Sequence, residues 1–415
     1  MTAHRPPRTR VLITGAPRKQ IVAAFFGLIF LTTLLGGCVS RQSWEATRLL
    51  QDIDAGSRPS ALKEKTPRPS RTTLRYEVDG TAARADLYEP NQPIGGALVL
   101  VPGFTRDGKD DARVVNLATS LARARFLVLV PDVPGSRQLR VRLEDSRDIG
   151  AAMVHLADLR PAAAEQGVAV VAISYAVGLA AIASRDVRAQ APLHFLVGIG
   201  GYYDTAAVVT YATTGRYRLA KTGPWRVGKP LEAAKWVFLA SNAVVLDSPT
   251  DRAILERISE RCFEGCDEGT EVLLRNARAE GLGPEGLALL RLITNRDPDR
   301  VAELLAALPP SVKAQLEGLS LRGDDLDVLE GRLVLVHGRL DPMIPYSESL
   351  ALATTVPDSE VFVIDGFSHI TPRDVGWSGK LQLIDAIQAV LSRRSAPPEA
   401  TAAKADKGAD TQAER

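Results

Sequence analysis

The sequence predicts an α/β protein, built on a mainly parallel sheet with helices on its faces. Short apolar runs rich in β-branched residues recur along the chain, as at Ala97–Val101, Phe126–Val130 and Val168–Ile173. Continuous runs of this length are typical of strands that are buried on both faces. Helical sequence separates these runs, and such alternation implies parallel strands joined by right-handed crossovers.

The same reasoning places the other elements of the sheet. Residues 73–78 and 82–88 flank Asp79-Gly80, which predicts a hairpin ahead of the first buried strand. Three more strands are predicted at 193–199, 332–337 and 360–364. Helices are expected at 111–123, 143–159, 177–184, 346–354 and 379–392.

The composition fits a globular protein and argues against a polyanion-binding one. The chain has 415 residues, of which 45% are hydrophobic and 24% charged, with a net charge of +2. A chain of this length can bury a large core in one or two domains. Because it has no basic cluster interleaved with aromatic residues, we expect no nucleic-acid partner.

The segment 203–328 interrupts the alternation of strands and helices. It has no long β-branched run, and its apolar residues follow a helical period over the stretches 231–243, 250–261, 269–279, 284–294 and 298–308. We expect a helical cap over the carboxyl ends of the strands, where insertions often cover a binding cleft. A separate helical domain is the alternative. On either side of this insertion, we expect the α/β core to comprise residues 71–202 and 329–395.

Residues 1–37 predict an export signal. Basic residues precede an apolar run at 21–35, which at about 15 residues is shorter than the ~20 needed by the alternative, a transmembrane anchor. The sequence Leu35-Gly36-Gly37-Cys38 that follows resembles the lipobox of bacterial lipoproteins. The resemblance implies cleavage before Cys38, a lipid on its thiol, and a membrane-anchored envelope protein that faces the periplasm or the cell exterior.

The two ends of the mature chain are expected to lie outside the core. Residues 38–70 are polar and proline-containing, which predicts a tether with a short helix near residues 43–51. Residues 396–415 have no bulky apolar side chains, which predicts a disordered tail.

Cys262 and Cys266 are the other two cysteines and lie four residues apart. In an exported protein this spacing favours a local disulfide. No second pair of ligands accompanies them, so a metal site is not expected. Two free thiols are the alternative.

The junction at Ser174 carries the main functional signal. The strand predicted at Val168–Ile173 leads directly through Ser174 into helical sequence. This layout resembles a nucleophile elbow, except that Ala172 and Ala176 stand where glycines are usual. A serine that only caps the helix is the alternative.

Strand order, elbow and insertion together resemble the α/β-hydrolase fold, whose members carry nucleophile, acid and histidine in that chain order. The resemblance implies Ser174 as nucleophile and Asp341, after the strand at 332–337, as acid. It implies His369 as base, because His369 alone of the five histidines follows the last strand. A turn aspartate and a solvated loop histidine are the alternatives, with Asp204 as a second candidate acid.

The resemblance also implies an oxyanion hole and a reaction. The backbone N–H groups of Tyr175 and Phe104 would hold the oxyanion. The expected activity is hydrolysis of carboxylic esters, of small-molecule or lipid origin, without a metal or organic cofactor. The alternative is a non-catalytic binding or scaffold protein of the envelope on the same fold, which the alanines at 172 and 176 favour.

Overall fold

The computed structural model describes residues 42–161, 164–220, 222–263, 265–266, 268–368 and 375–394. The chain divides into two units, residues 1–45 and 46–415. The first is described only at residues 42–45, and all that follows concerns the second. Within the described ranges, no helix has the length and hydropathy needed to cross a bilayer. The predicted signal segment, Cys38 and the tail at 396–415 lie outside the described residues.

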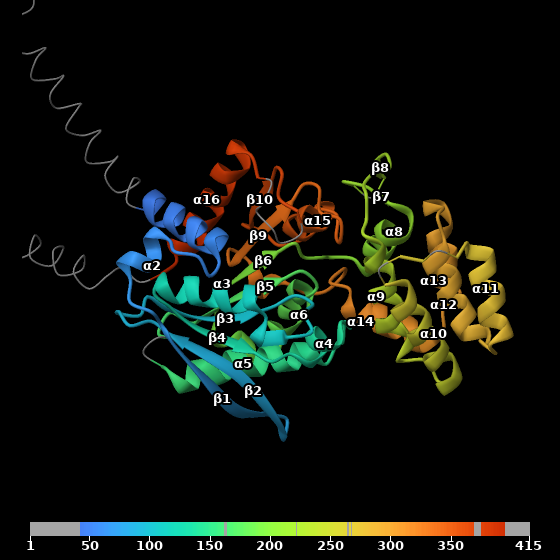
Figure 1. The fold of residues 1–415 in the computed structure, drawn as a ribbon, viewed down its shortest axis with the longest axis horizontal. Helices are drawn as coiled ribbons and strands as arrows, with labels where there is room; N and C mark the ends of the chain where they lie inside the picture. The colour runs from blue at the N-terminus through green and yellow to red at the C-terminus, as the bar shows by residue number, and fades with distance from the viewer. Residues whose placement is uncertain are drawn as a thin grey trace, which may run out of the picture. The chain divides into compact units, whose positions relative to one another are not determined.

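Eight strands form one sheet in the order β1-β2-β4-β3-β5-β6-β9-β10 (Figure 1). The first two strands form an antiparallel hairpin, and the second is also antiparallel to β4. All other neighbours are parallel, which confirms the predicted fold class. The strands are β1 (Ser70–Val78), β2 (Thr81–Glu89), β3 (Gly96–Val101), β4 (Phe126–Pro131), β5 (Val168–Ile173), β6 (Leu193–Ile199), β9 (Leu333–Gly338) and β10 (Glu360–Ile364).

Two hydrophobic layers cover the sheet because alternate residues of each strand point to opposite faces. In β3, Leu98 and Leu100 pack with α3 (Ala112–Arg123), whereas Val99 packs with α5 (Asp145–Leu159) on the other face. The remaining helices of the core are α2 (Ala61–Lys65), α4 (Pro134–Gln138), α6 (Ala176–Ala183), α7 (Val187–Gln190), α15 (Ser347–Thr355) and α16 (Trp377–Leu391), with short 3₁₀ turns η1 (Gly108–Asp110) and η3 (Asp327–Leu329).

The segment predicted as a tether contributes to the second unit, which begins at Ala46 and contains helix where a short helix was predicted near residues 43–51. Residues 46–55 are helical, and Ala46 and Leu49 are buried in the core layer that contains α3. The Asp52 carboxylate is also buried, and it accepts a hydrogen bond of 2.6 Å from Ser120 Oγ. Apolar residues spaced by three or four positions bury one face of this helix despite its polar composition.

Between β6 and β9 the chain forms a helical insertion with a hydrophobic core of its own, which includes Trp236, Leu255 and Leu289. Two of its helices, at its beginning and end, were not predicted. The first consists largely of Ala, Thr and Val, several of which are weak helix formers. The insertion contains α8 (Thr205–Thr214), α9 (Glu232–Ala243), α10 (Pro249–Cys262), α11 (Thr270–Ala279), α12 (Pro284–Thr294), η2 (Pro298–Arg300), α13 (Val301–Ala306), α14 (Pro310–Leu319) and the two-residue strands β7 (Arg216–Tyr217) and β8 (Arg226–Val227).

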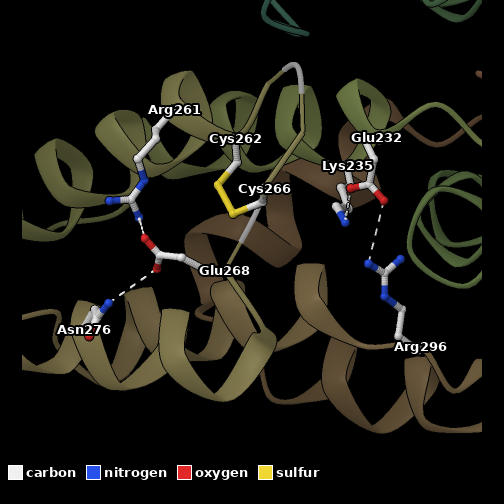
Figure 2. The surroundings of a disulfide bond; sticks show 8 residues. All are labelled: Glu232, Lys235, Arg261, Cys262, Cys266, Glu268, Asn276 and Arg296. Carbon is white, nitrogen blue, oxygen red and sulfur yellow. Dashed lines mark hydrogen bonds and ion pairs between the residues drawn. A yellow bond between two sulfur atoms is a disulfide. The ribbon is translucent and has the colours of Figure 1, made fainter.

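A disulfide joins Cys262, the last residue of α10, to Cys266, with their Cα atoms 4.4 Å apart (Figure 2). Polar contacts connect the same turn to its neighbours. Glu268 lies 3.5 Å from the Arg261 guanidinium and accepts a hydrogen bond of 3.4 Å from Asn276 Nδ2. The covalent link and the carboxylate together fix the path from α10 to α11.

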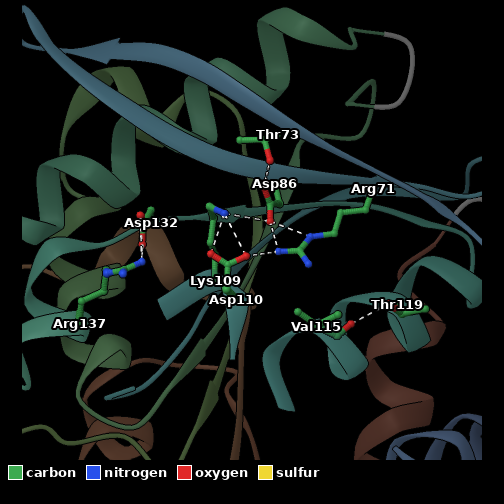
Figure 3. A network of polar contacts seen from close by, with 9 residues as sticks. All are labelled: Arg71, Thr73, Asp86, Lys109, Asp110, Val115, Thr119, Asp132 and Arg137. Atoms are coloured by element: carbon green, nitrogen blue, oxygen red, sulfur yellow. Dashed lines mark hydrogen bonds and ion pairs between the residues drawn. The ribbon is translucent and has the colours of Figure 1, made fainter. Parts of the chain in front are cut away.

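A buried ionic cluster connects the antiparallel edge of the sheet to η1, which follows β3 (Figure 3). Asp86 on β2 is fully buried and lies 3.2 Å from Lys109 Nζ and in contact with the Arg71 guanidinium. Thr73 Oγ1 donates a further hydrogen bond of 2.7 Å. Because a lone buried carboxylate is costly, these partners are needed to offset its desolvation. The cluster thereby anchors the far end of the loop that leaves β3.

Candidate active site

Ser174 lies in a strained turn between β5 and α6. Its φ is 61°, in the left-handed region that costs a residue other than glycine about 1–3 kcal/mol. Two hydrogen bonds fix the turn: the Ser174 N–H donates to the Ile199 carbonyl at 2.7 Å, and its own carbonyl accepts from the Val177 N–H at 3.1 Å. Such strain is typical of functional sites, and here it turns the serine side chain out of the strand.

The alanines on either side of this turn lie in the hydrophobic core. Ala172 and Ala176 are both fully buried. The closest approach between α6 and β6 falls instead on Val177, whose side chain fills the space beside Gly198 and Gly201. A Cβ on these glycines would come within 2.7 Å and 2.5 Å of the valine. Gly198 in β6 and Gly201 just after it therefore leave the room that the Val177 side chain occupies.

The loop after β3 places a second element beside the serine. The Phe104 and Tyr175 rings stack with their centroids 4.0 Å apart and their planes 11° apart. A Cβ on Gly103 would lie 3.3 Å from Ser174 Cβ, so this loop passes directly over the serine. Within the described part of the chain, the N–H groups of Phe104 and Tyr175 donate to no protein acceptor. Two uncommitted N–H groups next to a serine are what an oxyanion hole requires.

Asp341 occupies a tight turn after β9. Its Oδ1 accepts hydrogen bonds from the N–H groups of Met343 at 2.7 Å and Ile344 at 3.0 Å. Its backbone carbonyl accepts a third, of 2.8 Å, from the hydroxyl of Tyr211 on α8. The side chain is fully buried. Asp341 is therefore rigidly held within its turn, and a residue of the insertion contributes to holding it.

His337, near the end of β9, lies next to the candidate acid. Its Nε2 lies 3.4 Å from Asp341 Oδ2 and 2.9 Å from the Ile344 carbonyl, and its Nδ1 lies 2.7 Å from Ser349 Oγ. The ring is fully buried with both nitrogens engaged. His337 thus braces the acid turn and is not placed to accept a proton from substrate.

His369, the candidate base, lies outside the described residues, but the chain that leads to it is described as far as Ser368. Strand β10 ends at Ile364, which pairs in register with Gly338 at the end of β9. A Cβ on Gly338 would overlap the Phe367 carbonyl. Phe367, two residues before His369, therefore packs against the start of the acid turn.

Asp204, the second candidate acid, is committed to other contacts. Its Oδ1 accepts from the Ala206 N–H at 2.9 Å as the cap of α8, and its Oδ2 lies 3.4 Å from Arg322. The buried Glu348 on α15 accepts hydrogen bonds from the N–H groups of Tyr203 at 3.1 Å and Asp204 at 2.8 Å, and burial raises its pKa to about 7. These carboxylates join the end of β6 to the helix after the acid turn.

A cavity of about 90 Å³ lies between Ser174 and the helical insertion. Its wall is almost entirely apolar, which suits a hydrocarbon group better than a charged one. Ser174, the loop after β3, the turn that follows Asp341 and the insertion all contribute to this cavity, so it brings the candidate site together. Its lining includes Phe104, Ser174, Tyr175, Val208, Val237, Phe238, Leu316, Leu319, Met343 and Ile344.

In the described part of the chain, no group of three or more His, Cys, Asp or Glu could hold a metal ion.

No protein-family model and no curated protein matches the sequence. Among solved structures, a putative hydrolase from Legionella pneumophila superposes with a TM-score of 0.50 at 12% identity, over 81% of this chain and 94% of that one. A dienelactone hydrolase from Anabaena variabilis gives 0.40 at 11% identity, over 80% and 100%. An esterase from Pyrobaculum calidifontis gives 0.42 at 13% identity, over 85% and 91%.

The strand order, the strand–serine–helix turn and the match to the Legionella structure identify the fold. The chain has the α/β-hydrolase fold, with a helical insertion between β6 and β9. The resemblance of the sequence to the α/β-hydrolase fold is thereby confirmed for the fold.

Asp145, at the start of α5, is a buried carboxylate close to the oxyanion elements. It is fully buried against Gly135 of α4, with Arg142 Nε 3.9 Å away. Burial raises its pKa to about 7. The folded protein therefore holds this proton up to a higher pH than the unfolded chain, in which an aspartate titrates near pH 4.

We expect this group to make the unfolding free energy fall as pH rises from about 4 to 7, because the unfolded state loses its proton first. Asp145→Asn removes that contribution. The unfolding free energy of the variant minus that of wild type should therefore increase by on the order of 2 kcal/mol from pH 5 to pH 8. Chemical denaturation at both pH values measures the difference. The exposed Glu165→Gln is the control. An equal difference at both pH values would contradict the assignment.

Proposed function

We propose that this protein is a serine hydrolase that cleaves carboxylic esters, with Ser174 as nucleophile, His369 as general base and Asp341 as the acid that orients it. The observation that carries the proposal is Ser174 itself. It has a φ of 61° at a strand–helix turn, lies beside two uncommitted N–H groups, and lines an apolar cavity. The fold alone would not support an activity, because many functions share it.

In the proposed reaction, Ser174 Oγ attacks the ester carbonyl carbon while His369 accepts the hydroxyl proton. The N–H groups of Phe104 and Tyr175 stabilise the oxyanion that forms, at about 3 kcal/mol of barrier for each donor. Collapse of the tetrahedral intermediate expels the alcohol, which takes the proton from His369. Water then attacks the acyl-enzyme, with His369 as base, and releases the carboxylic acid. Asp341 keeps the imidazole in the required tautomer.

The alternative, a non-catalytic binding or scaffold protein, rests on Ala172 and Ala176. The turn at Ser174 is formed with both alanines present and buried. A binding protein has no need of a strained serine or of unpaired N–H groups beside it, since both are costly to maintain. These features favour the catalytic proposal.

A fluorophosphonate probe distinguishes a serine hydrolase from a non-catalytic scaffold protein, because it labels a serine only when that serine is activated. The wild-type protein should react, Ser174→Ala should not, and Asp341→Asn should react far more slowly. Ser184→Ala is the matched control: Ser184 is buried at the end of α6 and donates to the Ala181 carbonyl at 2.7 Å. A folded wild-type protein that is not labelled, or labelling that survives in Ser174→Ala, would favour the scaffold alternative.

The small cavity suggests a short acyl group. At about 90 Å³ it is smaller than the ~150 Å³ engineered cavity that accepts benzene, so an acyl chain of a few carbons fits. The apolar wall formed by Val237, Phe238 and Leu316 would pack against it.

Nitrophenyl acetate and butyrate should accordingly give kcat/KM values about tenfold or more above that of the decanoate. Leu316→Ala enlarges the cavity and should shift the preference toward longer chains. Leu290→Ala, at a residue of the same core that does not line the cavity, should lower stability without changing the preference. A wild-type preference for the decanoate would contradict the short-acyl proposal.

We also propose that the protein is attached to a bacterial envelope membrane through a lipid on Cys38, on the strength of Leu35-Gly36-Gly37-Cys38 after the apolar segment. Cys38→Ser should abolish labelling by a radioactive fatty acid and leave the signal uncleaved. Fractionation and mass spectrometry of the N-terminus measure both. Processed termini and unchanged partitioning in the variant would show that the lipobox interpretation is wrong.

A further inference from the structure

Both peptide groups next to Phe104 are held by a single residue, Ser136 of α4. Ser136 Oγ donates a hydrogen bond of 2.6 Å to the Gly103 carbonyl, and its own carbonyl accepts one of 3.2 Å from the Thr105 N–H. Ser136 is fully buried, so these bonds do not compete with water. The loop after β3 is thus tied to α4 immediately before and immediately after the residue that would donate to the oxyanion.

The bond to the Gly103 carbonyl sets the direction of the Phe104 N–H, because both belong to one planar peptide group. That peptide is trans, so its C=O and N–H point in opposite directions. With the oxygen held toward Ser136, the N–H must point away from α4. Gly103 itself lies against Ser174, with 3.3 Å between a Cβ built on it and Ser174 Cβ.

Other contacts of the loop do not replace this one. The stacking of the Phe104 and Tyr175 rings locates a side chain, but it leaves the peptide plane before Phe104 free to turn. Thr105 Oγ1 donates to Asp111 Oδ2 at 2.6 Å, which fixes the chain beyond the donor. Gly103 has the largest conformational freedom of any residue type, so the plane of its carbonyl needs an external partner.

We propose that Ser136 is a positioning residue of the oxyanion hole: its hydroxyl holds the Gly103–Phe104 peptide so that the Phe104 N–H faces the oxyanion formed at Ser174. The proposal rests on the serine-hydrolase function proposed above. Ser136 does not touch substrate. It acts by orienting a donor before the reaction begins, which is where most of the benefit of an oxyanion hole arises.

Steady-state kinetics with nitrophenyl butyrate test the proposal in the full-length protein. Ser136→Ala should lower kcat by about 10- to 100-fold, with KM changed by no more than about threefold, because the lost interaction acts in the transition state. A trifluoromethyl ketone of the same acyl length, which forms an oxyanion on the serine, should lose affinity by a similar factor. Ser136→Thr keeps a hydroxyl and should recover part of kcat.

Ser120→Ala separates positioning from simple loss of stability. Ser120 is a buried serine that donates one hydrogen bond, of 2.6 Å, to Asp52, on the other layer of the core. It should lower the melting temperature about as much as Ser136→Ala but leave kcat near the wild-type value. Unchanged kcat and ketone affinity in Ser136→Ala would overturn the positioning role. Absence of any Ser174-dependent activity in wild type would instead overturn the proposed function.

Discussion

The left-handed backbone at Ser174 is the constraint on which the rest of the structure depends. A serine at φ 61° costs about 1–3 kcal/mol, so the fold must hold it from several sides. The Ile199 carbonyl fixes its N–H, and Val177 packs into the space left by Gly198 and Gly201. Strand β6 and the residues that follow it therefore support a turn that belongs to its neighbour, and this turn forms with both alanines present.

The loop after β3 and the turn at Asp341 are also each held by more than one contact. Ser136 fixes one end of the loop after β3, and the ion pair of Lys109 with the buried Asp86 fixes the other (Figure 3). On the opposite side, Tyr211 of the insertion and His337 of the core both brace Asp341. A site whose donors are ordered in advance spends less free energy on reorganisation during reaction. Because Tyr211 belongs to the insertion, that segment supports the acid as well as covering the cavity.

Much of the fold could be predicted because its strands are unusually regular. Runs such as Leu98–Val101 are buried on both faces, and a continuous apolar run cannot be mistaken for an amphipathic helix or a polar loop. The packing of residues 46–65 against the core could not be predicted for the opposite reason: a few apolar residues on one helical face provide it, whereas prolines and charges dominate the composition of the segment. Helix α8 was missed because tertiary packing, rather than propensity, stabilises its Ala, Thr and Val residues.

The sequence by itself determined the fold class, which follows from local patterns of apolar runs and turns, and its resemblance to a family supplied Ser174, Asp341 and His369 as candidates. Only the tertiary structure decided that Ser136 orients the loop after β3, that Tyr211 and His337 brace the acid, and that the cavity over Ser174 is small and apolar. The hydrogen bonds of Ser136 and Tyr211 join residues 33 and 130 positions apart. No local pattern marks them, because they arise only when strands distant in the sequence bring their carboxyl ends to one edge of the sheet.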